Sequence, residues 1–126
     1  MDRNKLEQHI LKRFGVHGEQ PWMKYPSFSV FRHADNKKWF AVIMAISKKR
    51  LGIDSDEITE VVNLKCDCNM IPYLTREDGF FPAYHMSKTH WITVALDGSV
   101  DDNTISELVK QSFDLTCRKQ NRNAGN

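Results

Sequence analysis

Trp39-Phe40-Ala41-Val42-Ile43-Met44-Ala45-Ile46 is the stretch that decides the fold, because it is continuously apolar yet too short to cross a membrane. Side chains alternate between the two faces of a strand. The even-numbered residues from Phe40 to Ile46 should therefore share one face, and the odd-numbered residues from Trp39 to Ala45 the other. Both faces would be apolar, which predicts an interior strand of a sheet that is covered on both sides.

Four further strands are predicted around this one. Residues 28–33 lie upstream and should pair with it through a turn at residues 34–37. Downstream, residues 60–66 alternate, with Val62, Leu64 and Cys66 expected inward and Val61, Asn63 and Lys65 outward. Residues 80–84 and 90–96 should form a second hairpin.

Three helices complete the prediction. Apolar residues recur at helical spacing over residues 6–14. Asp67 is placed to cap a short helix that ends by Gly79, and Asp101 or Asp102 to cap a final helix. The predicted order is αβββαββα, which is an α+β domain.

The length and composition indicate one domain over residues 1–118 and a disordered polar tail over residues 119–126. No apolar run reaches the roughly 20 residues of a transmembrane helix, and no signal core follows the N-terminus. The three cysteines are odd in number, which favours reduced thiols. We therefore expect a cytoplasmic protein that is monomeric and does not contact a membrane.

Charge is distributed unevenly along the chain. Residues 1–50 carry 11 lysines and arginines against 4 aspartates and glutamates, whereas the remainder is acidic. Basic residues bracket the central strand at Lys37-Lys38 and at Lys48-Lys49-Arg50. Such a distribution can attract phosphates, or it can simply keep the ends of a strand solvated.

Neither a metal site nor a catalytic site is predicted. Cys66, Cys68, His85 and His90 would make an adequate tetrahedral zinc set, but their spacing is not that of a known finger. Cys66, His85 and Asp67 can be assembled on paper into a nucleophile and base, yet no nucleophile elbow, phosphate loop or dinucleotide motif accompanies them. We expect a protein that is not an enzyme and has no cofactor.

Two segments carry a resemblance to a known family. Asn63-Leu64-Lys65-Cys66-Asp67 is followed, after the short helix, by Pro82-Ala83-Tyr84-His85-Met86 and then by Lys88, His90 and Trp91. This pattern resembles the MmcQ/YjbR family of small bacterial proteins that are often described as DNA-binding.

The resemblance implies a twisted antiparallel sheet whose terminal helices pack on one face, a fold similar to that of secretion chaperones and, more loosely, of frataxin. Iron binding of the frataxin kind would need an acidic ridge on the first helix, where Asp2 and Glu7 are outnumbered by basic residues. We therefore expect no iron site.

Two functions fit these features. The first is weak, sequence-nonspecific DNA binding through basic hairpins. The second is a protein-binding adaptor or chaperone-like module that uses the open sheet. The residues predicted to contact nucleic acid are Lys37, Lys38, Lys48, Lys49, Arg50, Lys65, Tyr84, His85, Lys88 and His90.

Overall fold

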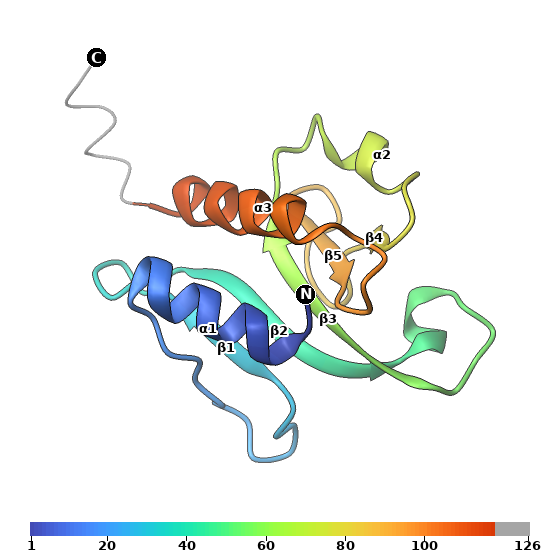
Figure 1. The fold of residues 1–126 in the computed structure, drawn as a ribbon, viewed down its shortest axis with the longest axis horizontal. Coiled ribbons are helices and arrows are strands. Elements are labelled where there is room, and N and C mark those ends of the chain that lie inside the picture. The colour runs from blue at the N-terminus through green and yellow to red at the C-terminus, as the bar shows by residue number, and fades with distance from the viewer. Residues whose placement is uncertain (118–126) are drawn as a thin grey trace.

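The computed structural model describes residues 1–117, so the tail predicted over residues 119–126 lies outside the described residues. Its elements follow the predicted αβββαββα order, with a short 3-10 helix, η1, added after the second strand (Figure 1). They are α1 (Arg3–Phe14), β1 (Ser29–Arg32), β2 (Trp39–Ser47), η1 (Lys48–Leu51), β3 (Ile58–Lys65), α2 (Ile71–Leu74), β4 (Phe80–Pro82), β5 (Trp91–Ala95) and α3 (Asp102–Leu115).

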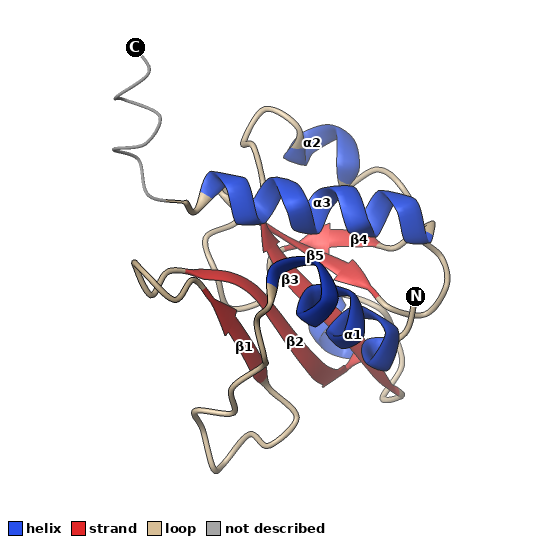
Figure 2. Ribbon diagram, turned by 60° about the vertical axis from the view of Figure 1, so that its left-hand side comes forward, coloured by secondary structure: helices blue, strands red, loops and turns tan. Residues whose placement is uncertain are grey.

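The five strands form one antiparallel sheet in the order β1-β2-β3-β5-β4. Figure 2 shows α1 and α3 together on one face of this sheet. Their apolar stripes meet the sheet in the main core, to which α1 contributes Leu6 and Ile10 and α3 contributes Ile105 and Val109. The α+β fold and the packing of both terminal helices on one face are therefore confirmed.

The opposite face of the sheet, here called the open face, carries no helix but has an apolar cluster of its own. Val30, Val42, Met44, Ile46 and Val61 form this cluster, with partly buried aromatic and methionine side chains packed on it. Both faces of β2 are thus apolar, as predicted.

A β-bulge changes which side chains of β2 lie on each face. Phe31 of β1 pairs with Ala41, but Arg32 pairs with Trp39, so Phe40 is the extra residue. Phe40 and Ala41 therefore both enter the core under the helices, whereas Trp39 packs on the open face. The strict alternation predicted for Trp39 and Phe40 was wrong at these two positions, because it assumed an unbroken ladder.

Two expectations about β3 and α2 are also corrected. Val61 and Asn63 lie on the face opposite Val62 and Leu64, as predicted, but this face is not outward: both residues are fully buried, because loops cover the open face at the centre of the sheet. Asp67 does not cap α2: its carboxylate accepts the Asn69 amide at 2.8 Å in a turn that precedes the helix. Gly79 lies beyond the end of α2, in the turn before β4.

Candidate ligand-binding pocket

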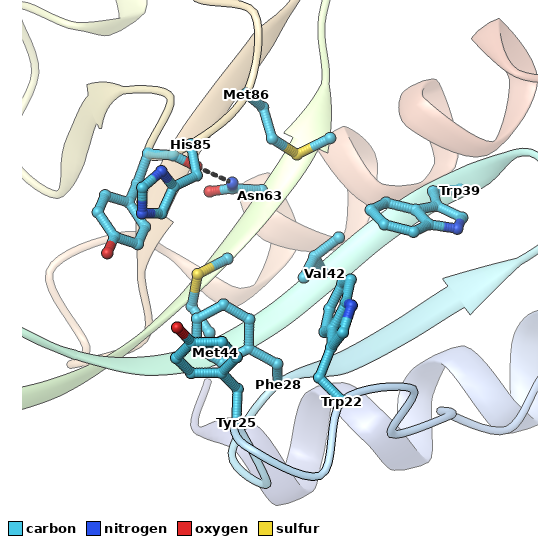
Figure 3. A pocket seen from close by; sticks show the side chains of 10 residues that line it. Trp22, Tyr25, Phe28, Trp39, Val42, Met44, Asn63, His85 and Met86 are labelled. Carbon is cyan, nitrogen blue, oxygen red and sulfur yellow. Dashed lines mark hydrogen bonds between the residues drawn. The ribbon is translucent and has the colours of Figure 1, made fainter.

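A pocket of about 310 Å³ lies on the open face of the sheet. Its walls come from the loop before β1, from β2 and β3, and from the turn after β4, and these side chains face one another across the cavity in Figure 3. The lining residues are Trp22, Tyr25, Phe28, Trp39, Val42, Met44, Asn63, Tyr84, His85 and Met86. The lining contains six rings and two thioethers and no carboxylate, so it suits a flat or apolar group.

One wall is the loop between α1 and β1. Two prolines, Pro21 and Pro26, bound its tip, and successive turns close it through the Tyr25 amide to the Trp22 carbonyl at 3.1 Å. Trp22 packs its ring nearly at right angles to those of Phe28 (86°) and Trp39 (79°). Trp22 and Tyr25 nevertheless remain 36% and 54% exposed, and their rings border the mouth of the pocket.

The floor is a buried hydrogen-bond network centred on Asn63. Its amide nitrogen donates to the Tyr84 carbonyl at 2.8 Å, and its oxygen accepts the Thr93 hydroxyl at 2.5 Å. The Thr93 oxygen in turn accepts the Tyr84 amide at 2.9 Å. Both polar groups of the Tyr84 backbone are thereby tied to β3 and β5. An unpartnered buried amide is costly, so this network fixes where the next residue, His85, stands.

His85 occupies a backbone conformation that side chains rarely adopt. Its φ is 60°, in the left-handed region, and its ring lies 4.1 Å from that of Tyr84. The Asn63 network immediately before it holds the turn in this shape. The imidazole is exposed at the wall of the pocket, where it can exchange hydrogen bonds with a ligand.

The charged residues that lie next to the lining residues along the chain have a single sign. Five lysines lie within two positions of a lining residue, and no aspartate or glutamate does. We call them the rim lysines: Lys24, Lys37, Lys38, Lys65 and Lys88. None of the five takes part in a salt bridge within residues 1–117. The nearest acid along the loop, Glu19, is held by Arg32, and this hydrogen-bonded ion pair lowers the pKa of the carboxyl.

Six of the ten predicted contact residues either line this pocket or lie within two positions of a lining residue. Tyr84 and His85 line it, and Lys37, Lys38, Lys65 and Lys88 are rim lysines by their place in the chain. Lys38 directly precedes Trp39, so alternation directs its side chain to the helix-covered face of the sheet. Lys65 follows Asn63 by two residues on β3, so its half-buried side chain leaves the sheet on the same face. The Lys88 ammonium also has a structural contact, because it donates to the Ala83 carbonyl at 2.9 Å.

His90 lies beside the rim without lining the pocket. Its carbonyl accepts the Cys66 amide at 2.8 Å at the end of the β3–β5 pair, and its side chain is exposed. Trp91, which starts β5 opposite Lys65, is partly buried.

The remaining predicted residues, Lys48, Lys49 and Arg50, lie at the other end of β2. We call Lys48 and Lys49 the distal lysines. Lys48 pairs with Glu57, which raises the pKa of the ammonium, and Lys49 pairs with Asp56 at 3.1 Å. Acidic residues between η1 and β3 thus pair with two of the three basic residues of this run.

The structure separates the residues of the hypothetical catalytic and zinc sets. Cys66 is 3% exposed and belongs to the core under the helices, where burial raises the pKa of its thiol. His85 stands on the open face. Across residues 1–117, no three His, Cys, Asp or Glu side chains are placed to hold a metal ion. No helix in the same range has the length and apolar character needed to cross a bilayer.

Sequence reasoning did not identify most of the pocket lining, including Trp22, Tyr25, Met44 and Asn63. One local signal was available, since Trp22 and Tyr25 stand between two prolines, where an aromatic residue has no strand to pack in. The rest depended on contacts between segments far apart in the chain.

The fold and pocket together define a small α+β domain with one helix-covered face and one open, pocket-bearing face. The YjbR family model matches residues 11–115, and the chain belongs to this family. It is 34% identical to the uncharacterized protein YyaQ of Bacillus subtilis, over 92% of this chain and 98% of that protein.

Solved structures with the same fold are known. A crystal structure of a Pseudomonas syringae protein is 38% identical, with a TM-score of 0.91, over 93% of this chain and all of the other. A solution NMR structure from the same organism gives a TM-score of 0.84 at 38% identity, over 93% of this chain and 94% of the other. A Deinococcus radiodurans protein shares the fold, with a TM-score of 0.71. It is 22% identical, and the match covers 94% of this chain and 80% of the other.

Proposed function

We propose that this protein is a non-enzymatic DNA-binding module whose contact surface is the pocket and its rim. The observation that carries the proposal is the arrangement of charge along the chain: five lysines, and no aspartate or glutamate, lie within two positions of the residues that line an aromatic pocket. Lysines that are not neutralised by neighbouring acids attract phosphates and release counterions on binding.

The binding should be weak and without sequence preference. Lysine acts as a point charge, whereas reading a guanine edge in the major groove typically uses the planar fork of arginine. Arg32, which belongs to the strand next to the loop, is already engaged by Glu19 through two hydrogen bonds of 2.7 and 2.8 Å. The rim therefore supplies attraction to the phosphate backbone without a fixed reader of the bases.

A protein-binding adaptor is the second candidate, and one observation favours it. Met23 is fully exposed at the tip of the loop, between Trp22 and the basic Lys24. Methionines suit surfaces that accept varied apolar partners. In this alternative the open face would accept a segment of another protein, and affinity would depend little on salt.

The test is a fluorescence-anisotropy titration of labelled DNA with the full chain at several salt concentrations. We expect the logarithm of the association constant to fall linearly with the logarithm of the salt concentration, by about 0.7 to 0.9 per phosphate contacted. Absence of binding even at the lowest salt would remove DNA binding and leave the adaptor.

A further inference from the structure

The shape of the pocket distinguishes two kinds of nucleic acid. In a duplex the bases are stacked inside, so a flat basic surface is sufficient to meet the phosphates. A concave pocket lined by rings offers nothing to a duplex unless a base leaves the stack, which costs a few kcal/mol. The pocket and the rim lysines therefore fit a strand whose bases are already unpaired.

We propose that the pocket accepts one unpaired base of a single strand while the rim lysines contact the neighbouring phosphates. This inference rests on the proposed DNA-binding function and deepens it. Trp22 and Tyr25 provide ring surface at the mouth, where a base can stack. The Met44 and Met86 side chains line the interior, and flexible thioethers can adjust to bases of different size.

Trp22 is the side chain on which the proposal depends most. It packs edge-to-face with both Phe28 and Trp39, at ring centroid distances of 6.1 and 5.7 Å, so its position is set by its neighbours. It is still partly exposed, so part of its ring surface remains open to a ligand. His85 lies on the other side of the cavity and can bond to the edge of the base (Figure 3).

The phosphates flanking such a base would meet lysines from separate segments. Lys24 belongs to the loop that carries Trp22, and Lys37 and Lys38 precede Trp39. Lys65 leaves β3 on the face of Asn63. Several segments thus contribute both a ring to the cavity and a lysine next to it in the chain, a combination used by surfaces that bind single strands without sequence preference.

The experiment compares three probes at one low salt concentration: an oligothymidylate of about 12 nucleotides, the same strand without its bases, and a duplex of equal length. We expect the oligothymidylate to bind roughly tenfold or more tightly than the other two. Trp22→Ala should abolish this advantage and leave duplex binding unchanged, and Trp22→Phe should retain most of it. Tyr73→Ala is the matched control, because Tyr73 is an aromatic residue of α2, 69% exposed and outside the pocket.

Each failure has its own meaning. Equal binding of the strand with and without bases, or no effect of Trp22→Ala, overturns base insertion and leaves DNA binding standing. Absence of binding to all three probes overturns both proposals. An acidic peptide with one aromatic residue that displaces the oligothymidylate and binds more tightly also overturns both, and assigns the pocket to a protein partner.

Discussion

The two ends of β2 both carry adjacent lysines, yet they are held in place by different forces. At the pocket end, two hydrogen bonds connect the turn that contains Lys37 and Lys38 to Thr116, the C-cap residue of α3. The His33 ring bonds to the Thr116 hydroxyl (2.8 Å), and the Asn36 side-chain amide donates to the Thr116 carbonyl (2.8 Å). At the distal end, the ion pairs of Lys48 and Lys49 with Glu57 and Asp56 themselves link η1 to the start of β3.

This difference separates lysines that hold the structure from lysines that remain available. Because the hydrogen bonds of His33 and Asn36 to Thr116 hold the β1–β2 turn, the side chains of Lys37 and Lys38 are not needed to hold it, and both residues are exposed. The distal lysines already have carboxylate partners, so a phosphate would have to compete with those partners. A count of lysines along the chain cannot distinguish the two situations.

The largest effect on stability should follow from removing the hydrogen bond between Thr116 and His33, which holds the pocket-end turn. Thr116→Val keeps the shape of the side chain but leaves the His33 ring nitrogen without its partner, and His33 is 6% exposed. We expect a loss of about 1–3 kcal/mol in the free energy of unfolding, measured by urea denaturation. Thr104→Val, at a half-buried position of α3, the helix that Thr116 caps, is the control and should change stability by less than about 0.5 kcal/mol. Equal losses of stability in the two variants would show that the hydrogen bond between Thr116 and His33 does not stabilise the fold.

The next effect concerns DNA binding at the two ends of β2. Lys37→Gln combined with Lys38→Gln should reduce the salt dependence of binding by up to about two, with about one for each phosphate contact that is lost. Lys48→Gln combined with Lys49→Gln should reduce it by less than about one, since both lysines are already paired. Anisotropy titrations across salt measure both slopes. The reverse order of effects would place the DNA at the distal end.

A smaller effect should come from freeing the distal lysines. Asp56→Asn combined with Glu57→Gln removes their partners, and we expect the salt dependence of DNA binding to rise by about one or less. The melting temperature should hardly move, because exposed ion pairs contribute little to stability. A large drop in melting temperature would mean that these pairs hold the turn more strongly than surface pairs usually do.

The smallest effect should be a pH dependence at the pocket end. Burial lowers the pKa of His33 below its ordinary value of 6.5, with Asp35 opposing that shift. The folded protein therefore binds this proton less readily than the unfolded chain does, so stability is fully present above pH 6.5 and declines as the pH falls toward the lowered pKa. His33→Phe, which cannot titrate, should lack this component when the two unfolding curves are compared across pH. An NMR titration that places the His33 pKa at or above its ordinary value would contradict the expectation.

The fold could be predicted from the sequence because its signals are local. Leu6 and Ile10 recur at helical spacing, and apolar and polar residues largely alternate over residues 90–96. Each of these elements can therefore be recognised from a few neighbouring residues. The family resemblance supplied the packing of the terminal helices on one face. Its most specific block, around Tyr84 and His85, also pointed to one wall of the pocket.

The rest of the pocket could not be predicted, because its walls meet only through the sheet order. Trp22 and Met86 are far apart in the chain and line one cavity, since β3 lies between β2 and β5. The ion pairs of the distal lysines could not be predicted from the sequence either. Glu57 and Asp56 reach them only because the chain turns back after η1.

The bulge opposite Arg32 acts on β2 as a change of parity. Before it, odd-numbered residues face the open side, and after it, even-numbered residues do, so Trp39 and Val42 reach the same pocket although an odd number of positions separates them. One extra residue thus lets a single strand give Trp39 to the pocket and Phe40 to the core. Deleting Phe40 would restore strict alternation and keep Trp39 on the open face and Ala41 in the core, but the core under the helices would lose one of its large aromatic side chains.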